Sequence, residues 1–106
     1  MDKYFNSFKE KVLFKIDNGE VLSEGELEEW FDWFDEIDEK HYSKHRWFQP
    51  VTTIFKIDDR YFQLDWEEGL TEYQPNHFPS QPFEVQREEH EEVVTIVSWK
   101  KVEKND

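Results

Sequence analysis

The chain of 106 residues contains no cysteine, and it has only three glycines and four prolines. The lack of cysteine excludes a disulfide framework and a thiolate site, and it suits a reducing cytosol. So few glycines leave no glycine-rich loop of the kind that cradles a phosphate. Basic residues are also scarce, with 13 against 26 acidic ones, which gives a net charge of −13. This charge argues against direct binding to nucleic acid or to an anionic membrane, and it favours a basic partner.

Long hydrophobic runs are missing as well. No apolar stretch approaches the roughly 20 residues of a membrane-spanning helix, and the N-terminus does not resemble a signal peptide. We therefore expect a soluble, cytoplasmic protein. Aromatic residues are plentiful at 18% of the chain, with ten Phe, five Trp and four Tyr. Each buried aromatic side chain removes about 150–250 Å² from water, so a few of them can build the core of one domain over residues 1–106.

Residues 52–66, TTIFKIDDRYFQLDW, predict a β-hairpin that turns at Asp58-Asp59, with strands at 51–57 and 60–66. Asp tolerates the positive φ of a two-residue turn better than most residues. If Ile57 lies opposite Arg60, a set of apolar pairs shares one face of the hairpin. These pairs are Phe55–Phe62, Thr53–Leu64 and Val51–Trp66.

Two helices are expected before the hairpin. Helical spacing of apolar residues predicts the first at 2–17, with Asp2 as its cap, although a strand over 12–16 is the competing interpretation. Ser23 and Glu26 match the capping-box pattern and predict the start of a second helix over 24–40. Its apolar arc contains Leu27, Trp30, Phe31, Phe34 and Ile37, and its opposite face contains Glu28, Asp32, Asp35 and Glu39.

Two further strands are predicted at 83–88 and 93–100, after a proline-rich ordered loop over 67–82. The predicted fold class is therefore α+β, with two N-terminal helices packed on one face of a four-stranded antiparallel meander. The aromatic faces of the second helix and the hairpin should meet. We expect the following side chains to be mostly buried: Phe31, Phe34, Phe55, Phe62, Leu64 and Trp66.

Three short motifs resemble those of a family of small acidic proteins from phages and prophages of Gram-positive bacteria. They are Arg46-Trp47, Asp65-Trp66-Glu67 and the run Gln81-Pro82-Phe83-Glu84-Val85. The resemblance covers residues 20–100. It implies a phage setting and supplies no catalytic residues. Many small acidic phage proteins inhibit nucleases or repressors of the host, which is an analogy of setting rather than of sequence.

The acidic face of the predicted second helix has two interpretations. It is a solvated surface that keeps an aromatic-rich protein soluble, or it mimics a nucleic-acid backbone. Carboxylates three and four residues apart on a helix lie about 5–6 Å from each other, which suits a groove that binds phosphates. The second interpretation predicts binding and inhibition of a basic, nucleic-acid-binding host protein, for example a CRISPR or restriction nuclease. The predicted partner-binding residues are Glu28, Asp32, Asp35, Glu36, Glu39, Asp65, Glu67 and Glu68.

The sequence also allows two other classes of function. A non-inhibitory adaptor or structural phage protein would bind through an exposed sheet edge or through the loop aromatics Trp47, Phe48, Tyr73 and Phe78. An enzyme is not expected, because no motif distinguishes any pair of carboxylates from the many others. His41 and His45 could bind a metal if the helix continued through them, but an HxxxH spacing alone is a weak signal. We therefore expect no catalytic residues, no metal and no cofactor.

Overall fold

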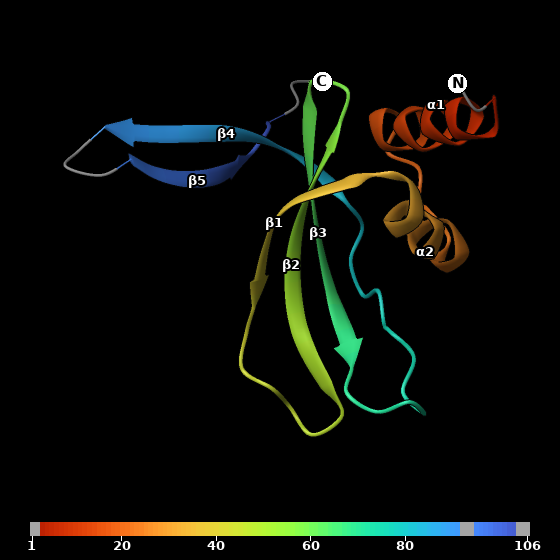
Figure 1. Ribbon diagram of the computed structural model, residues 1–106. Helices are drawn as coiled ribbons and strands as arrows, with labels where there is room; N and C mark the ends of the chain where they lie inside the picture. The colour runs from red at the N-terminus through yellow and green to blue at the C-terminus, as the bar shows by residue number, and fades with distance from the viewer. Residues whose placement is uncertain (1–2, 92–94, 104–106) are drawn as a thin grey trace.

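Two helices and five strands make up the fold, which a computed structural model describes over residues 3–91 and 95–103. The five strands form one antiparallel sheet in the order β1-β2-β3-β4-β5 (Figure 1). The predicted α+β class is confirmed, and the sheet has one strand more than expected. The elements are α1 (Lys3–Asp17), α2 (Glu24–Trp33), β1 (Asp35–His41), β2 (Phe48–Ile57), β3 (Arg60–Gly69), β4 (Phe83–Glu91) and β5 (Thr95–Lys101).

The prediction of a helix over 24–40 is wrong beyond Trp33. The helix ends at Phe34, whose φ of −108° and ψ of 146° are extended, and the next residues form β1 along the edge of β2. Carboxylates crowd what would have been the last turns, where the helix dipole favours positive charge, and α2 has no basic residue in its last turn. The free edge of β2 instead gives these residues backbone hydrogen bonds. Ile37, expected on the apolar helix face, lies at a bulge in β1 and is exposed.

The predicted hairpin is confirmed as β2 and β3. Ile57 lies opposite Arg60, Phe55 opposite Phe62 and Val51 opposite Trp66. Asp58 in the turn has a φ of 57°, as a two-residue turn requires. Both strands run three residues further from the turn than expected, and β3 ends at Gly69. A side chain at Gly69 would collide with the carbonyl oxygen of Gln74, because the returning loop crosses 1.8 Å from the position of a Cβ atom.

The helices cover one face of the β1–β2–β3 part of the sheet, here called the inner face (Figure 1). Trp30 is fully buried between them, with its ring 5.7 Å from Phe55 and 6.0 Å from Phe62 in edge-on contacts. Of the six side chains predicted to be buried, five are: Phe34, Phe55, Phe62, Leu64 and Trp66. Phe31 is only half-buried, because it lies at the margin of the core against Phe78.

Strands β4 and β5 form an arm that projects from the sheet (Figure 1). β4 pairs with β3 over three residues, from Phe83 to Val85, and beyond them it pairs with β5. Both predicted strands lie at the expected positions, although residues 93 and 94 and the expected cap Asp2 lie outside the described residues. The predicted helix at 2–17 is confirmed as α1, which excludes the alternative strand over 12–16.

Arg60 fastens the base of this arm. Its guanidinium group lies between Glu84 at the start of β4 and Asp17 at the end of α1, with N–O distances of 3.0 and 2.8 Å. The hydrogen bonds that Arg60 donates to Glu84 and then to Asp17 raise the pKa of Arg60 above its ordinary value. One side chain in the hairpin therefore joins the helix layer, the central hairpin and the arm.

Candidate functional site

The carboxylates of α2 occupy the side of the helix that faces solvent. Glu24, Glu28 and Asp32 follow each other at intervals of four residues and are all exposed, whereas Leu27 and Trp30 are buried against the sheet. A capping box fixes the start of α2 and therefore the direction in which these side chains point. The Ser23 side chain accepts a hydrogen bond from the Glu26 backbone N–H, and the Glu26 carboxylate accepts one from the Ser23 backbone N–H.

Glu26 differs from the exposed carboxylates of α2 because its carboxylate forms ion pairs with α1. Its carboxylate lies 2.9 Å from Lys15 Nζ and 3.3 Å from Lys11 Nζ, both on α1. Burial raises its pKa, but the hydrogen bonds from Ser23, Lys15 and Lys11 outweigh burial and lower the pKa to about 2. Glu26 is therefore an internal anchor and not part of an exposed acidic surface.

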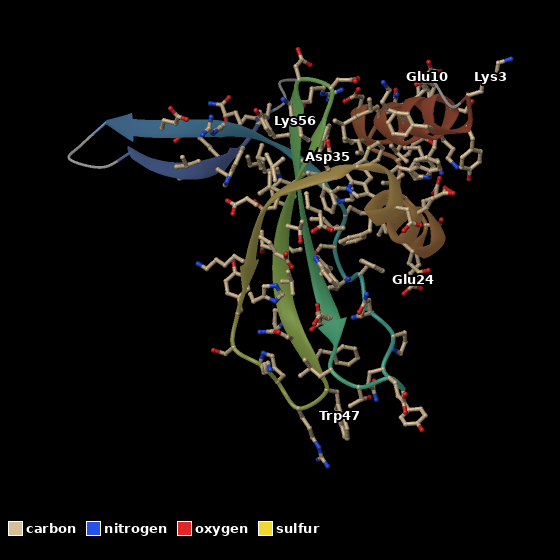
Figure 2. The ribbon with its side chains drawn as sticks, viewed as in Figure 1. Lys3, Glu10, Glu24, Asp35, Trp47 and Lys56 are labelled. Carbon is tan, nitrogen blue, oxygen red and sulfur yellow. The ribbon has the colours of Figure 1, made fainter. Side chains whose placement is uncertain are left out.

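The remaining predicted acidic residues of this region lie on β1 rather than on the helix. Asp35, Glu36 and Glu39 are exposed, and β1 begins two residues after α2 ends. Asp35 pairs across the strands with Lys56, and the two lie close together in Figure 2. Partial desolvation, followed by repulsion from Glu39, raises the pKa of Glu36. Glu36 and Glu39 are therefore close enough to repel each other, and no described lysine or arginine forms an ion pair with either.

We call the set Glu28, Asp32, Asp35, Glu36 and Glu39 the acidic ridge. It is not the single helix face that the sequence predicted, since it runs about 6 Å along α2, from Glu28 to Asp32, and about 13 Å along β1, from Asp35 to Glu39. Four of its members, Glu28, Asp32, Asp35 and Glu36, make no side-chain hydrogen bond or ion pair with another described residue; Glu39 lies 2.7 Å from His41 Nε2. The ridge thus presents carboxylates whose hydrogen-bonding capacity is largely unused within the described part of the fold.

The predicted acidic residues of β3 are not brought together with the ridge. Side chains alternate along β3, so Asp65 and Glu67 lie on the outer face of the sheet, away from the helices, while Glu68 lies on the inner side. Asp65 Oδ1 accepts hydrogen bonds from Thr52 Oγ1 at 2.7 Å and Gln63 Nε2 at 2.9 Å. Glu67 Oε1 lies 2.7 Å from His77 Nδ1. Asp65 and Glu67 are therefore engaged by neighbours within the fold.

His41 and His45 do not lie on one helix, as a metal site at their spacing would require. His41 ends β1, and His45 lies in the loop that follows, where its backbone N–H donates to the Phe48 carbonyl. Among the side chains that the structure describes, those of residues 3–89 and 97–103, no group of three His, Asp or Glu is arranged to hold a metal ion. None of the described helices is both long and apolar enough to cross a membrane.

The loop aromatics divide into two kinds. Trp47 and Tyr73 are 45% and 84% exposed, and Trp47 lies beyond the far end of the sheet from Lys56 (Figure 2). Phe78 packs against Phe31 and Trp66, with ring centroids 6.0 and 6.1 Å away, so it closes the margin of the core. Of the candidate anchors for a partner, Trp47 and Tyr73 are the ones that solvent reaches best.

Sequence reasoning missed a set of outer-face residues that come together around Trp99. The Trp99 Nε1–H donates to Asp38 Oδ2 at 2.9 Å, and its ring lies 5.1 Å from that of Tyr61. Strand alternation indicated that Tyr61 lies on the face opposite Phe62. It gave no signal for the contact between Asp38 and Trp99, which are 61 residues apart in sequence.

No family model matches this chain, and no curated protein or solved structure is similar enough to it to count as a match.

Proposed function

We propose that the protein is a non-catalytic binding protein whose acidic ridge contacts a basic surface on a nucleic-acid-binding partner and blocks that surface. The single observation that carries the proposal is the row of exposed carboxylates on α2 and β1, on a chain with a net charge of −13. Four of the five form no hydrogen bond or ion pair with another described side chain. In a phage setting, which the resemblance of motifs such as Asp65-Trp66-Glu67 implies, the partner would be a defence protein of the host cell, for example a CRISPR or restriction nuclease.

The geometry supports this function through rigidity as well as charge. The start of α2 is fixed by its capping box, and its buried side is held by Leu27 and Trp30. β1 is held by pairing with β2. The carboxylates therefore sit on backbone that is already ordered, so little conformational entropy is lost on binding. The negative field also steers a basic partner toward the ridge and raises the association rate.

A second role competes for the β1 part of the ridge. β1 is an edge strand, and charged side chains with a bulge are the usual means by which such strands avoid pairing with other molecules. Protection of an edge requires charge on β1 alone. It does not require Glu28 and Asp32 on α2, which a binding role does use.

The test compares two variants with the same change of net charge. The ridge variant carries E28Q, D32N, D35N, E36Q and E39Q. The control variant carries E10Q, E20Q, D59N, E72Q and E103Q, which neutralises five exposed carboxylates away from the ridge. Host proteins captured by the parent are identified, and the affinity of the captured partner for each variant is then measured against salt and against duplex DNA. We expect the ridge variant to bind at least about tenfold more weakly, with a shallower salt dependence, and the control to bind nearly as the parent does.

If both variants bound the partner equally weakly, the loss of affinity would follow from net charge and not from the ridge, and the proposal would be overturned. The adaptor alternative makes the opposite prediction, because exposed Trp47 and Tyr73 would then be the anchors. In that case a Trp47→Ala, Tyr73→Ala variant loses binding, the ridge variant keeps it, and duplex DNA does not compete.

A further inference from the structure

The outer face of the sheet carries a groove made of three adjoining hollows, of about 480, 350 and 400 Å³. The first and second hollows share Tyr42, Thr52 and Gln63, and the second and third share Asp38, Val97 and Trp99. The groove follows β2 from Pro50 to Lys56, a length of about 20 Å. This is the length of an extended chain of about six residues.

A hydrogen bond between the two edge strands of the sheet holds the groove in shape. β1 and β5 lie at opposite edges of the sheet, yet Trp99 of β5 donates a hydrogen bond to Asp38 of β1. This contact curls the sheet over its own outer face. Ile54, in the middle of β2, consequently has only 3% of its surface exposed although it points away from the helices. The groove is therefore formed before any ligand arrives.

The floor of the groove is fixed by hydrogen bonds. Thr52 Oγ1 and Gln63 Nε2 both donate to Oδ1 of Asp65, so this carboxylate is held in one orientation. These three side chains lie on the middle of β2 and β3, which are paired along their whole length. A rigid floor of this kind favours a ligand with a defined spacing of its own polar groups.

Charge is distributed unevenly along the groove. Asp65 and Glu67 line the end near Pro50, whereas Lys56, Arg87 and Asp38 line the end near Trp99. At this second end Arg87 pairs with Glu89, and Asp38 accepts a hydrogen bond from the Trp99 indole, so Lys56 is the charge offered to a ligand. Lys56 lies over the ring of Tyr61, 6.0 Å from its centroid, and makes no ion pair with a described carboxylate. A neutral oligosaccharide would leave this polarity unused. A peptide with opposite charges at its two ends would match it.

We propose that this groove binds an extended segment of a partner polypeptide. A Lys or Arg of the segment lies at the Asp65 end, and an Asp or Glu lies at the Lys56 end. An apolar side chain between them packs near Val97 and Trp99, which line the middle hollow. Asp65 pairs with Thr52, which is four residues from Lys56, so the two charged side chains of the peptide should be four residues apart and on one face. The site is separate from the acidic ridge except at Glu39, which belongs to the ridge and also lines the middle hollow.

The probes are capped heptapeptides of the form Gly-Lys-Thr-X-Thr-Glu-Gly, in which X is Leu, Val, Tyr or Phe. Matched peptides carry Lys at both charged positions, Glu at both, or Ala at both. Binding is followed by the NMR signal of the Trp99 indole N–H, which is assigned by its loss in W99F. We expect the mixed-charge peptides to shift this signal and to bind about tenfold more tightly than any of the matched sets.

The K56E variant makes the groove acidic at both ends, so its preference should change to the peptides with two Lys residues. The matched control is K100E, which has the same change of charge but lies on the opposite face of the arm from Trp99. It should keep the preference of the parent. E28Q/D32N should also keep it, because those ridge residues lie on α2.

Three results would overturn the proposal. The first is that no mixed-charge peptide shifts the Trp99 indole signal at millimolar concentration. The second is an identical change of preference in K56E and K100E, which would make the effect one of net charge. The third is a shift produced by the neutral sugar cellohexaose and not by the peptides, which would assign the groove to a glycan instead.

Discussion

At the scale of single residues, Glu26 shows how one carboxylate serves two structural purposes. It closes the capping box with Ser23, and it pairs with Lys15 and Lys11 across the contact between the two helices. Its neighbour Glu28 is exposed and has no such partners among the described residues. Two carboxylates on the same turn of α2 therefore differ in what they contribute to the free energy of unfolding.

We predict that E26Q lowers the free energy of unfolding by about 2 kcal/mol at pH 7, since Gln can keep the cap but loses both ion pairs. The pKa of Glu26 is about 2 in the folded chain, against 4.5 as its ordinary value. A lowered pKa means that the stabilisation is complete above pH 4.5 and is lost as the pH falls toward 2. Urea unfolding at several pH values should show the parent and E26Q converging at pH 2. The E28Q control should follow the parent throughout, and two parallel profiles for the parent and E26Q would contradict the assignment.

At the scale of elements, the β4–β5 arm is the most weakly attached part of the described sheet. Three residue pairs join β4 to β3, in contrast to the full-length pairing of β2 with β3. A two-stranded ribbon is marginally stable by itself, so the contacts that attach the arm to the rest of the fold contribute strongly to its stability. Two sets of side-chain hydrogen bonds attach the arm: Arg60 donates to Glu84, and Trp99 donates to Asp38.

We predict that R60K lowers the free energy of unfolding by about 1–2 kcal/mol and speeds amide hydrogen exchange at Phe83–Val85. A lysine keeps the positive charge, but it lacks the planar fork that reaches Asp17 and Glu84 together. The matched control is R87K, because Arg87 pairs with Glu89 on the exposed arm and such surface pairs contribute little. Exchange that accelerates equally in R60K and R87K would show that the Arg60 contacts do not anchor the arm.

At the scale of the whole molecule, the net charge of −13 opposes the compact state by repulsion between like charges. Partial desolvation and, after it, the proximity of Glu39 raise the pKa of Glu36, so repulsion between like charges also acts locally. The aromatic core must overcome this cost. Trp30 illustrates the strength of that core, with its ring in edge-on contact with Phe34, Phe55 and Phe62.

We predict that about 0.5 M NaCl raises the melting temperature at pH 7, because salt screens the repulsion between exposed carboxylates. The gain should become small near pH 4.6, the isoelectric point, where positive and negative charges balance. Differential scanning calorimetry at both pH values checks this prediction. A salt effect of the same size at pH 4.6 would mean that screening of the net charge is not its cause.

Much of the fold was predictable because it depends on local signals. The capping box placed the start of α2, and the alternation around Asp58-Asp59 gave the pairing of Phe55 with Phe62. The end of α2 was not predictable in this way. Apolar residues continue at helical spacing through Ile37, and the choice of strand over helix depends on the free edge of β2, which comes later in the chain.

In the candidate site, too, some features depend on local signals and others on the tertiary structure. The net charge and the aromatic residues of the core could be read from the chain, because composition and short-range spacing specify them. Which carboxylates are exposed and share a surface depends on the fold: Glu28 and Glu39 belong to different elements of one ridge, while Asp65 lies half-buried on the outer face of the sheet. The groove around Trp99 depends on tertiary structure entirely. It exists because the curled sheet brings β5 to Asp38 of β1, and no local pattern in the chain encodes a contact between strands at opposite edges.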